Sequence, residues 1–268
     1  MPYTGLVRYQ THNFRRASNA IHSERKLLEA DVHIWHIPLA AASPIVGGYT
    51  LLLTPDEQAR AARFRFEIDR TRFVIARARM RILLASYLGC APAALAFSYN
   101  PHGKPYFNES PLSFNLSHAH ERALLGITMN RDVGVDVEYV RADFATEEVA
   151  ERYFSADELR ALRSLPREQQ ATAFFRCWTQ KEAYIKARGE GLSMPLADFT
   201  VCLQANECVR LIHHQDPREQ ERWELRNIPI ADGYVSAIAV EGHDLHFEYF
   251  NWNDHNDVSN DGENSRFL

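Results

Sequence analysis

The 268-residue sequence has little of what marks membrane, secreted or nucleic-acid-binding proteins. No run approaches the roughly 18 apolar residues that a membrane helix needs, and residues 1–30 hold no apolar stretch like that of a signal peptide. The four cysteines form no Cys-x-x-Cys pair, so we expect reduced thiols in a cytoplasmic protein. A net charge of −5 argues against a dedicated nucleic-acid binder, although local charge decides whether an anionic ligand binds.

The sequence also shows no internal repeat, and its two ends read differently from its middle. Residues 1–30 predict a loosely ordered extension, and the acidic, Asn-rich residues 251–268 predict a disordered tail. A hydrophobic content of 46% is enough for a core in the mixed α/β body between them. Helix pairs followed by strands occur in each half, so we predict two similar subdomains, 31–133 and 134–250.

Hydrophobic periodicity and turn residues divide the body into elements. The alternating pattern predicts strands over 31–38, 114–116, 123–129 and 133–139, and later over 199–203, 222–225, 234–240 and 244–250. Capping boxes open predicted helices at Thr54 and Ser155, and two longer helices are predicted over 69–88 and 166–188. Glycines follow both long helices and predict their ends.

A short acidic pattern, GVDVE at 134–138, lies on a predicted strand. Because a strand alternates its faces, Asp136 and Glu138 point the same way while the valines point to the core. Two adjacent carboxylates repel each other unless a cation lies between them, and Mg²⁺ takes carboxylates together with phosphate oxygens. An exposed strand face with solvated acids is the ordinary alternative, and the pentapeptide alone favours it.

Two further pairs are ambiguous in the same way. Glu182 and Lys186 lie four residues apart on a predicted helix, where a surface ion pair worth ~0.2–0.5 kcal/mol is the common explanation. The functional alternative makes Glu182 a metal ligand or base and Lys186 a cation for phosphate. Ser117 and His118 follow a predicted strand; a charged histidine binds phosphate, but a loop histidine satisfied by backbone is more common. A hydrolase couple is not predicted, because no Gly-x-Ser-x-Gly elbow is present.

Arginine is concentrated between Arg60 and Arg81, where eight arginines face only Glu67 and Asp69. In an acidic chain this predicts a local positive patch, and guanidinium groups suit phosphates. Arg72 falls in the first turn of a predicted helix, where the helix dipole also favours an anion. A solvated helix face is the alternative for most of the eight, and RNA binding is discounted because no RNA-recognition motif is present.

Taken in order, these motifs resemble those of the Sfp-type 4′-phosphopantetheinyl transferases. The resemblance is carried by Gly103-Lys104-Pro105-Tyr106, FNLSHA (114–119), GVDVE (134–138), Tyr153-Phe154-Ser155 with Glu158, and WTQKEAYIKARGEGL (178–192). It covers roughly residues 54–201, more than half of the chain. It implies a pseudo-twofold α/β (α+β) monomer of two similar subdomains, each a small antiparallel sheet with helices, and coenzyme A with Mg²⁺ in the cleft between them.

The resemblance also implies an activity. 4′-Phosphopantetheine would move from coenzyme A to a serine of an apo acyl or peptidyl carrier protein of fatty acid, polyketide or nonribosomal peptide biosynthesis, releasing 3′,5′-ADP. Asp136, Glu138 and Glu182 would bind the metal, Glu182 would serve as base unless metal-bound water does so, and Lys186 would stabilise the pyrophosphate. Coenzyme A contacts would come from Arg60, Arg72, Lys104, Ser117, His118 and Lys186.

One position departs from the family pattern. The residue three before Arg60 is often basic in such enzymes and is Glu57 here, which the sequence explains as the acid of the capping box opened by Thr54. A full cationic clamp on the 3′-phosphate is therefore in doubt, with Arg63 as a possible substitute.

Two other function classes compete with the transferase. A coenzyme A-binding or carrier-binding homologue without turnover is the first alternative, and the intact Asp136, Glu138, Glu182 and Lys186 argue against it. A Mg²⁺-dependent nucleotide hydrolase is the second. For the carrier protein, the sequence predicts an apolar docking surface between residues 134 and 165, with candidates Tyr139, Val140, Phe144, Val149 and Phe154.

Overall fold

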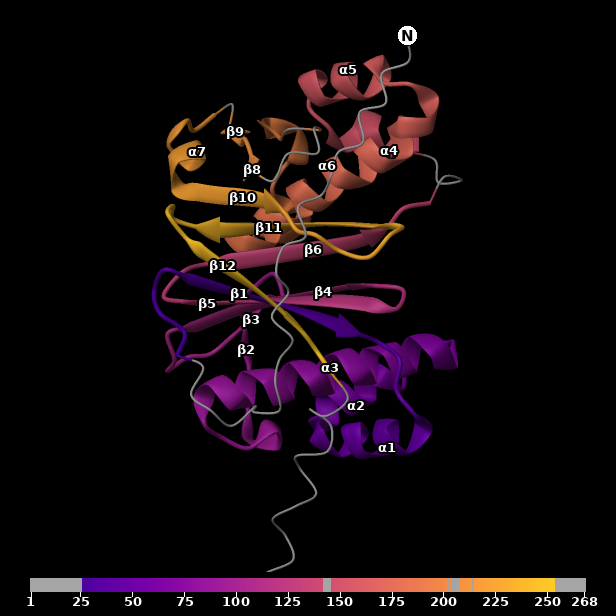
Figure 1. Ribbon diagram of the computed structural model, residues 1–268, viewed down its shortest axis with the longest axis vertical. Helices are drawn as coiled ribbons and strands as arrows, with labels where there is room; N and C mark the ends of the chain where they lie inside the picture. The colour runs from indigo at the N-terminus through magenta and orange to yellow at the C-terminus, as the bar shows by residue number, and fades with distance from the viewer. Residues whose placement is uncertain (1–25, 142–145, 202, 204–207, 214, 254–268) are drawn as a thin grey trace, which may run out of the picture.

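The computed structural model describes residues 26–141, 146–201, 203, 208–213 and 215–253. Two four-stranded sheets lie one above the other, with helices on their outer sides (Figure 1). The helices of the first half cover the lower sheet, and those of the second half gather at the opposite end of the molecule (Figure 1). This is the α+β architecture with two sheet-and-helix halves that the sequence predicts.

The first half comprises β1 (Asp31–Pro38), α1 (Ser43–Leu52), α2 (Pro55–Ala61), α3 (Glu67–Leu88), β2 (Ser98–Tyr99), β3 (Pro105–Tyr106), β4 (Leu112–Ala119) and β5 (Arg122–Met129). The second comprises β6 (Val133–Tyr139), α4 (Thr146–Tyr153), α5 (Ala156–Ser164), α6 (Arg167–Arg188), β7 (Phe199–Thr200), β8 (Cys208–Val209), β9 (Ile212–His213), α7 (Arg218–Arg222), β10 (Trp223–Asn227), β11 (Tyr234–Glu241) and β12 (His246–Asn251). Short 3₁₀ turns follow the two long helices, at Pro92–Ala94 and at Gly191–Ser193 and Leu196–Asp198.

The sheet order shows how the chain ties its halves together. The second sheet has the order β6-β11-β10-β8 and is antiparallel, and the first has the order β12-β1-β5-β4. β12 pairs parallel with β1, from Asp31 with His246 to His36 with Asn251. The sequence analysis grouped this last strand with the second half, whereas its hydrogen bonds place it in the first sheet.

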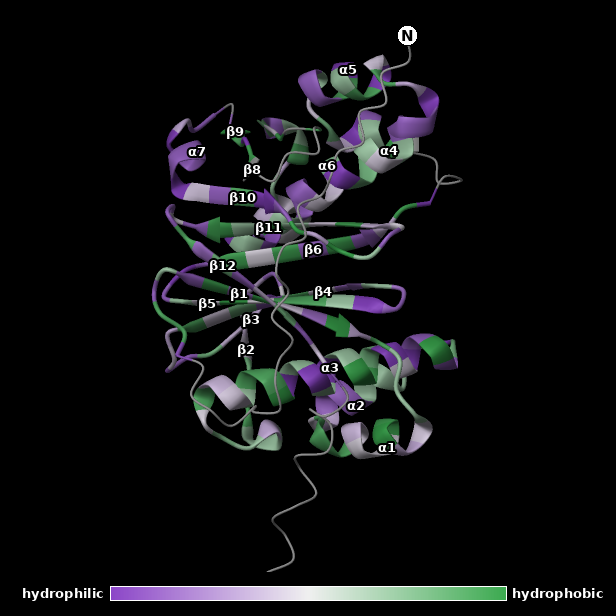
Figure 2. Cartoon of the chain, viewed as in Figure 1, coloured by the Kyte–Doolittle hydropathy of each residue, from purple (hydrophilic) through white to green (hydrophobic). Residues whose placement is uncertain are grey.

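Apolar side chains fill three clusters that correspond to this layering. One lies between α3 and the first sheet, one between α6 and the second sheet, and the third lies between the two sheets around Ile34, Leu124, Val135 and Val137. Figure 2 shows hydrophobic residues along β6 and β11, where the halves meet. Among the described residues, no helix combines the length and the apolar character that crossing a membrane requires.

Each half contains a buried ion pair between a short helix and a long one, which we name the anchor. Thr54 and Glu57 form a capping box on α2, and the Glu57 carboxylate accepts from Arg81 Nε on α3 at 2.8 Å. Ser155 and Glu158 form the same box on α5, and Glu158 Oε2 lies 2.8 Å from Lys181 Nζ on α6. Each cation also donates to carbonyls that follow its long helix, so each pair ties a long helix to the short helix before it and to the segment after it.

Candidate active site

The acidic motif faces the second long helix at close range. β6 and α6 pack directly against each other, and a Cβ atom placed on Gly134 would lie 2.2 Å from Ala183 O and from Ala187 N. Only glycine permits this approach. Because Gly134, Asp136 and Glu138 share one face of β6, the same contact brings the two acids toward the face of α6 that carries Glu182 and Lys186.

Asp136 is the centre of this contact. Its side chain is buried, and Oδ1 accepts hydrogen bonds from Ser117 Oγ at 2.8 Å and from Lys186 Nζ at 2.5 Å. Within the described chain its Oδ2 atom is buried and has no hydrogen-bond partner. A buried carboxylate oxygen without a partner is costly, so this atom is a candidate position for binding a ligand or cation.

Two side chains of β4 join the halves next to this carboxylate. Asn115 Oδ1 accepts from Val135 N at 2.9 Å, and Ser117 Oγ accepts from Val137 N at 3.4 Å. They satisfy N–H groups at the edge of β6 as a neighbouring strand would. Ser117, which the sequence analysis assigned to phosphate binding, is thus engaged with Asp136 and with the β6 backbone.

The carboxylates perturb one another. Burial raises the pKa of Glu138 to about 7, with a further contribution from the charge of Asp136. Burial also raises the pKa of Glu182, and Asp136 adds to the rise while Lys186 opposes it. Burial lowers the pKa of Lys186, but Asp136 and the two glutamates outweigh this effect and keep it above its usual range. The charges of the three carboxylates therefore all act on the ammonium group of Lys186.

An excess of buried negative charge is what a divalent cation neutralises. The unpartnered Oδ2 of Asp136 and the raised pKa values of Glu138 and Glu182 fit that requirement in charge and donor type. In the described residues, however, no three His, Cys, Asp or Glu side chains form a coordinating cluster. The structure therefore brings together carboxylates of a suitable kind, but not an assembled coordination sphere.

The cationic candidates lie on the first half. Burial lowers the pKa of His118 on β4, and the positive charges of Lys186 and Arg60 lower it further. Arg60 lies over the Phe73 ring at 5.4 Å, and Arg72 Nη2 lies 3.8 Å from Glu121 Oε1 in the β4–β5 turn. His118 thus connects Arg60 electrostatically with the Lys186 site, and Arg72 lies beside the same hairpin.

Lys104 has a different position from the other candidates. Its Nζ donates to Ala187 O at 2.7 Å, near the end of α6, and lies 3.4 Å from Asp132 Oδ1. Burial lowers its pKa. Asn100, which the sequence analysis did not identify, donates from Nδ2 to Gly189 O at 2.7 Å. The β2–β3 turn therefore fixes the end of the helix that carries Glu182 and Lys186, and only the Gly-Lys-Pro motif pointed to this turn.

The arginine patch is smaller than the sequence predicts. Arg79 and Arg81 are fully buried, because Tyr49 and Pro38 O accept from Arg79 while Glu57 accepts from Arg81. Glu57 also accepts from Arg77 at 2.7 Å. Burial raises the pKa of Glu57, but the bond from Arg81 and its other partners bring it below its usual range. Glu57 thus faces the interior, which explains why it replaces a basic residue.

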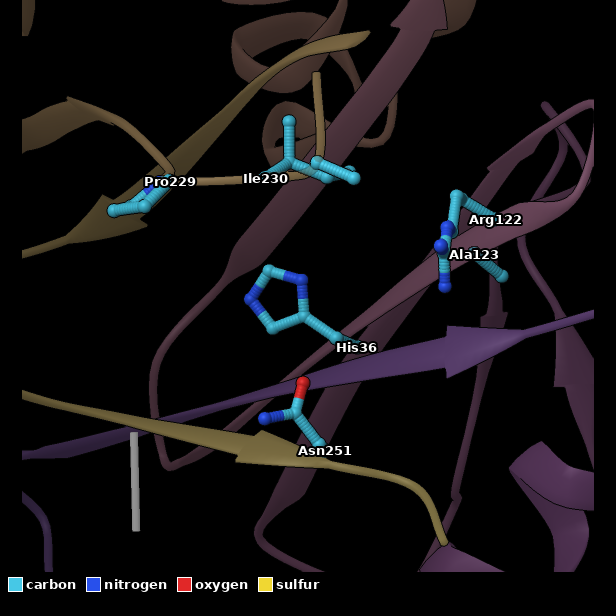
Figure 3. Close-up of a pocket in the computed structure, with 7 residues that line it drawn as sticks. His36, Arg122, Ala123, Pro229, Ile230 and Asn251 are labelled. Carbon is cyan, nitrogen blue, oxygen red and sulfur yellow. The ribbon is translucent and has the colours of Figure 1, made fainter. Parts of the chain in front are cut away.

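A separate cavity of about 330 Å³ opens among β1, β5, β12 and the β10–β11 connection (Figure 3). His36, Arg122 and Asn251 provide its polar lining, and none of the predicted site residues contributes. Burial, assisted by the charge of Arg122, lowers the pKa of His36 to about 4, so this ring is neutral near pH 7. No sequence pattern predicts this cavity, because its walls come from four distant segments.

The raised pKa of Glu138 predicts a pH-dependent stability. The folded chain binds the proton of this carboxyl more tightly than the unfolded chain, whose glutamates titrate near 4.5, so ionisation between that pH and about 7 costs stability. Glu138→Gln should therefore raise Tm by roughly 2–5 °C at pH 8 and change it little at pH 5. Thermal unfolding in EDTA at both pH values tests this; an equal or larger gain at pH 5 would contradict it.

Two family models match the chain in succession: the N-terminal domain of 4′-phosphopantetheinyl transferase over residues 47–128, and the 4′-phosphopantetheinyl transferase superfamily over residues 132–239. The 4′-phosphopantetheinyl transferase HetI of Nostoc sp. is 39% identical over 220 residues, covering 81% of this chain and 90% of that protein. Psf-1 of Bacillus pumilus is 36% identical (60% and 70% covered) and Sfp of Bacillus subtilis is 25% identical (70% and 82% covered); both carry the same enzyme name. The crystal structure of Thermotoga maritima holo-[acyl-carrier-protein] synthase matches 41% of this chain and 62% of its own, at 24% identity and a TM-score of 0.32.

Proposed function

The chain belongs to the 4′-phosphopantetheinyl transferase superfamily, and we propose that it moves the phosphopantetheine arm of coenzyme A, with Mg²⁺, onto a serine of an acyl or peptidyl carrier protein. The observation that carries this proposal is Asp136, buried with Lys186 on one carboxylate oxygen and no partner within the described chain on the other. Glu138 and Glu182 lie close enough to share its electrostatic field.

The carboxylates of Asp136, Glu138 and Glu182 would hold the metal. When bound, Mg²⁺ would neutralise the pyrophosphate of coenzyme A. Lys186 keeps its proton because its pKa is raised, so its ammonium can donate to a phosphate oxygen while the bond to 3′,5′-ADP breaks. In the structure this ammonium rests on Asp136, which holds it at the site before substrate arrives.

Glu182 would accept the proton of the carrier serine. Burial raises the pKa of Glu182, and a carboxylate with a raised pKa is a better base than an ordinary one. The serine oxygen would attack the phosphorus that bears the pantetheine arm, and the leaving oxygen would belong to 3′,5′-ADP. The protein's part is to position the two substrates and to balance charge, which is the main requirement of such displacements.

The nucleotide end of coenzyme A would lie on the first half. His118 is coupled through charge to both Lys186 and Arg60, and Arg72 flanks the same hairpin. Ser117 donates its single hydroxyl proton to Asp136, and Lys104 Nζ donates to Ala187 O, so both are already engaged within the protein. We therefore propose His118, Arg60 and Arg72 as the first contacts.

Mass spectrometry of an apo-carrier protein incubated with the chain, coenzyme A and Mg²⁺ tests the function. A mass gain equal to phosphopantetheine is expected. Coenzyme A binding without a mass gain would indicate a homologue without turnover. Release of a nucleotide product in the absence of carrier would indicate a hydrolase.

Arg72→Ala should weaken coenzyme A binding and leave the chemical step nearly intact. Loss of a hydrogen bond between charged groups corresponds to a rise of roughly tenfold in the KM for coenzyme A. If Arg72 binds the 3′-phosphate, the variant should hardly distinguish coenzyme A from dephospho-coenzyme A, so both KM values are measured in both proteins. A variant that still strongly prefers coenzyme A would place Arg72 elsewhere.

A further inference from the structure

The segment between α2 and α3 exposes large apolar side chains on an ordered backbone. Residues 62–68, which we name the Arg-Phe segment, read ARFRFEI and are all solvent-exposed. Phe66 is 58% exposed, Ile68 55% and Phe64 38%, whereas most large apolar residues of the chain are buried. A cluster of exposed apolar side chains is typical of a surface that binds another molecule, whereas single exposed apolar residues are ordinary.

Positive charge surrounds these side chains. Arg63 and Arg65 are exposed, and among the described residues no carboxylate forms an ion pair with either of them. Arg65 instead lies over the ring of Phe66 at 5.3 Å. Glu67, the acid within the segment, is paired with Arg70 at 2.7 Å. The segment is therefore a basic and apolar surface on a chain whose net charge is −5.

The Arg-Phe segment contacts a side chain that also contacts Arg60, one of the residues proposed to bind coenzyme A. Phe64 contacts Phe73 at 5.4 Å between ring centres, and the Arg60 guanidinium lies over the same Phe73 ring. The charge of Arg60 also lowers the pKa of His118. Arg72, in the first turns of α3, reaches Glu121 of the β4–β5 hairpin, whose strand β4 carries Ser117. A large substrate that brings a serine to Glu182 and Lys186 can therefore contact this segment.

The surface predicted from the sequence in the second half accounts for only part of such a contact. Tyr139 is 39% exposed and packs its ring on His120 and Tyr234. Phe154 is buried against Phe174, and Val140 and Val149 pack on the core of the second half. Phe144 lies outside the described residues. Among the described residues, the Arg-Phe segment gathers three exposed large apolar side chains, Phe64, Phe66 and Ile68, within five consecutive positions.

We propose that the Arg-Phe segment is a docking surface for the carrier protein, and that it binds an acidic face of the carrier around an apolar ridge. This inference rests on the proposed function and names the surface that selects its macromolecular substrate. Unpaired Arg63 and Arg65 attract carboxylates, and Phe66 and Ile68 gain by burial. Coenzyme A is a poorer ligand for the Arg-Phe segment, because its phosphates would bind the arginines and leave Phe66 and Ile68 exposed to water.

Steady-state kinetics with separate variation of the two substrates tests the docking surface. The apolar variant is Phe66→Ser with Ile68→Ser, and the charge variant is Arg65→Glu. Matched controls are Leu51→Ser on α1, where the side chain is 80% exposed, and the exposed Arg210→Glu in the second half. Both test variants should raise the KM for carrier protein by roughly tenfold or more, with kcat and the KM for coenzyme A within twofold of the wild-type values.

Salt separates the two contributions. The KM of the wild type for carrier protein should rise with ionic strength, and the charge variant should lose most of that dependence because screening acts on exposed charges. A wild-type chain that modifies no carrier would defeat the proposed function. If the wild type is active, an unchanged KM for carrier in both variants overturns the docking surface. A raised KM for coenzyme A alone would assign the segment to the nucleotide, and a wild-type dimer dissociated by Phe66→Ser with Ile68→Ser would assign it to a second copy.

Discussion

Replacing Asp136 with asparagine is expected to slow phosphopantetheine transfer by ~10²–10³-fold at saturating Mg²⁺, the range seen when one electrostatic group is removed from an active site. Asparagine keeps the shape of the side chain and removes its charge. The Lys186 ammonium then loses the negative charge on which it rests at 2.5 Å, and the buried Oδ2 position becomes an uncharged amide. The carrier's mass gain with time gives the rate.

The matched control is Glu224→Gln on β10. Glu224 is also a strand carboxylate bonded to a cation, since Arg226 Nη2 lies 2.5 Å from its Oε1 atom. This control should retain wild-type transfer. Tm should change little in Asp136→Asn, because Lys186 is 31% exposed and can be solvated. A rate near that of the wild type at saturating Mg²⁺ would remove Asp136 from the active site.

Local sequence rules predict most of the frame of this protein. The alternating patterns at 31–38 and 133–139 became β1 and β6 with the same bounds, and both capping boxes form as predicted. The glycines after α3 and α6 adopt φ of 62° and 70° and end their helices. These signals are readable because each one depends on a few neighbouring residues and not on distant packing.

Features that depend on tertiary contacts could not be read from the chain. Arg79 and Arg81 look like surface residues in a basic run, but their partners Tyr49 and Glu57 come from α1 and α2. The pairing of β12 with β1 joins residues more than 200 positions apart. Helix α1 begins with Ser-Pro and contains two glycines, so its composition favours a loop.

The anchor occurs in both halves, and its residues explain why the sequence shows no internal repeat. The cation bound to the capping-box glutamate is Arg81 in one half and Lys181 in the other. Arg81 lies over the Phe97 ring and Lys181 over the Phe199 ring. The two halves thus keep one physical arrangement through different residues, which preserves the packing and erases the sequence similarity. In the second half this anchor adjoins Glu182, so it also orients the helix face that carries the site.

Gly134→Ala should be the most damaging single-atom addition near the site. The new Cβ would meet backbone atoms, Ala183 O and Ala187 N, each 2.2 Å away, and helix backbone cannot rotate aside as a flexible side chain can. α6 must therefore move away from β6 by a distance on the order of 1 Å, and such a misplacement of catalytic groups can cost ~10²-fold in rate. Overpacking of this kind also destabilises a core by about 1–3 kcal/mol.

The predicted loss has a specific kinetic form. Glu182 and Lys186 move with α6, while Arg60 and His118 belong to the first half and stay in place, so kcat should fall and the KM for coenzyme A should change much less. Rates are measured well below the Tm of the variant, so that unfolding does not contribute. Gly48→Ala on α1 is the control, because no atom lies within 4 Å of its added Cβ and alanine favours a helix by roughly 0.5–1 kcal/mol. A Gly134→Ala enzyme with the kcat of the wild type would show that the close packing of β6 on α6 does not position the catalytic groups.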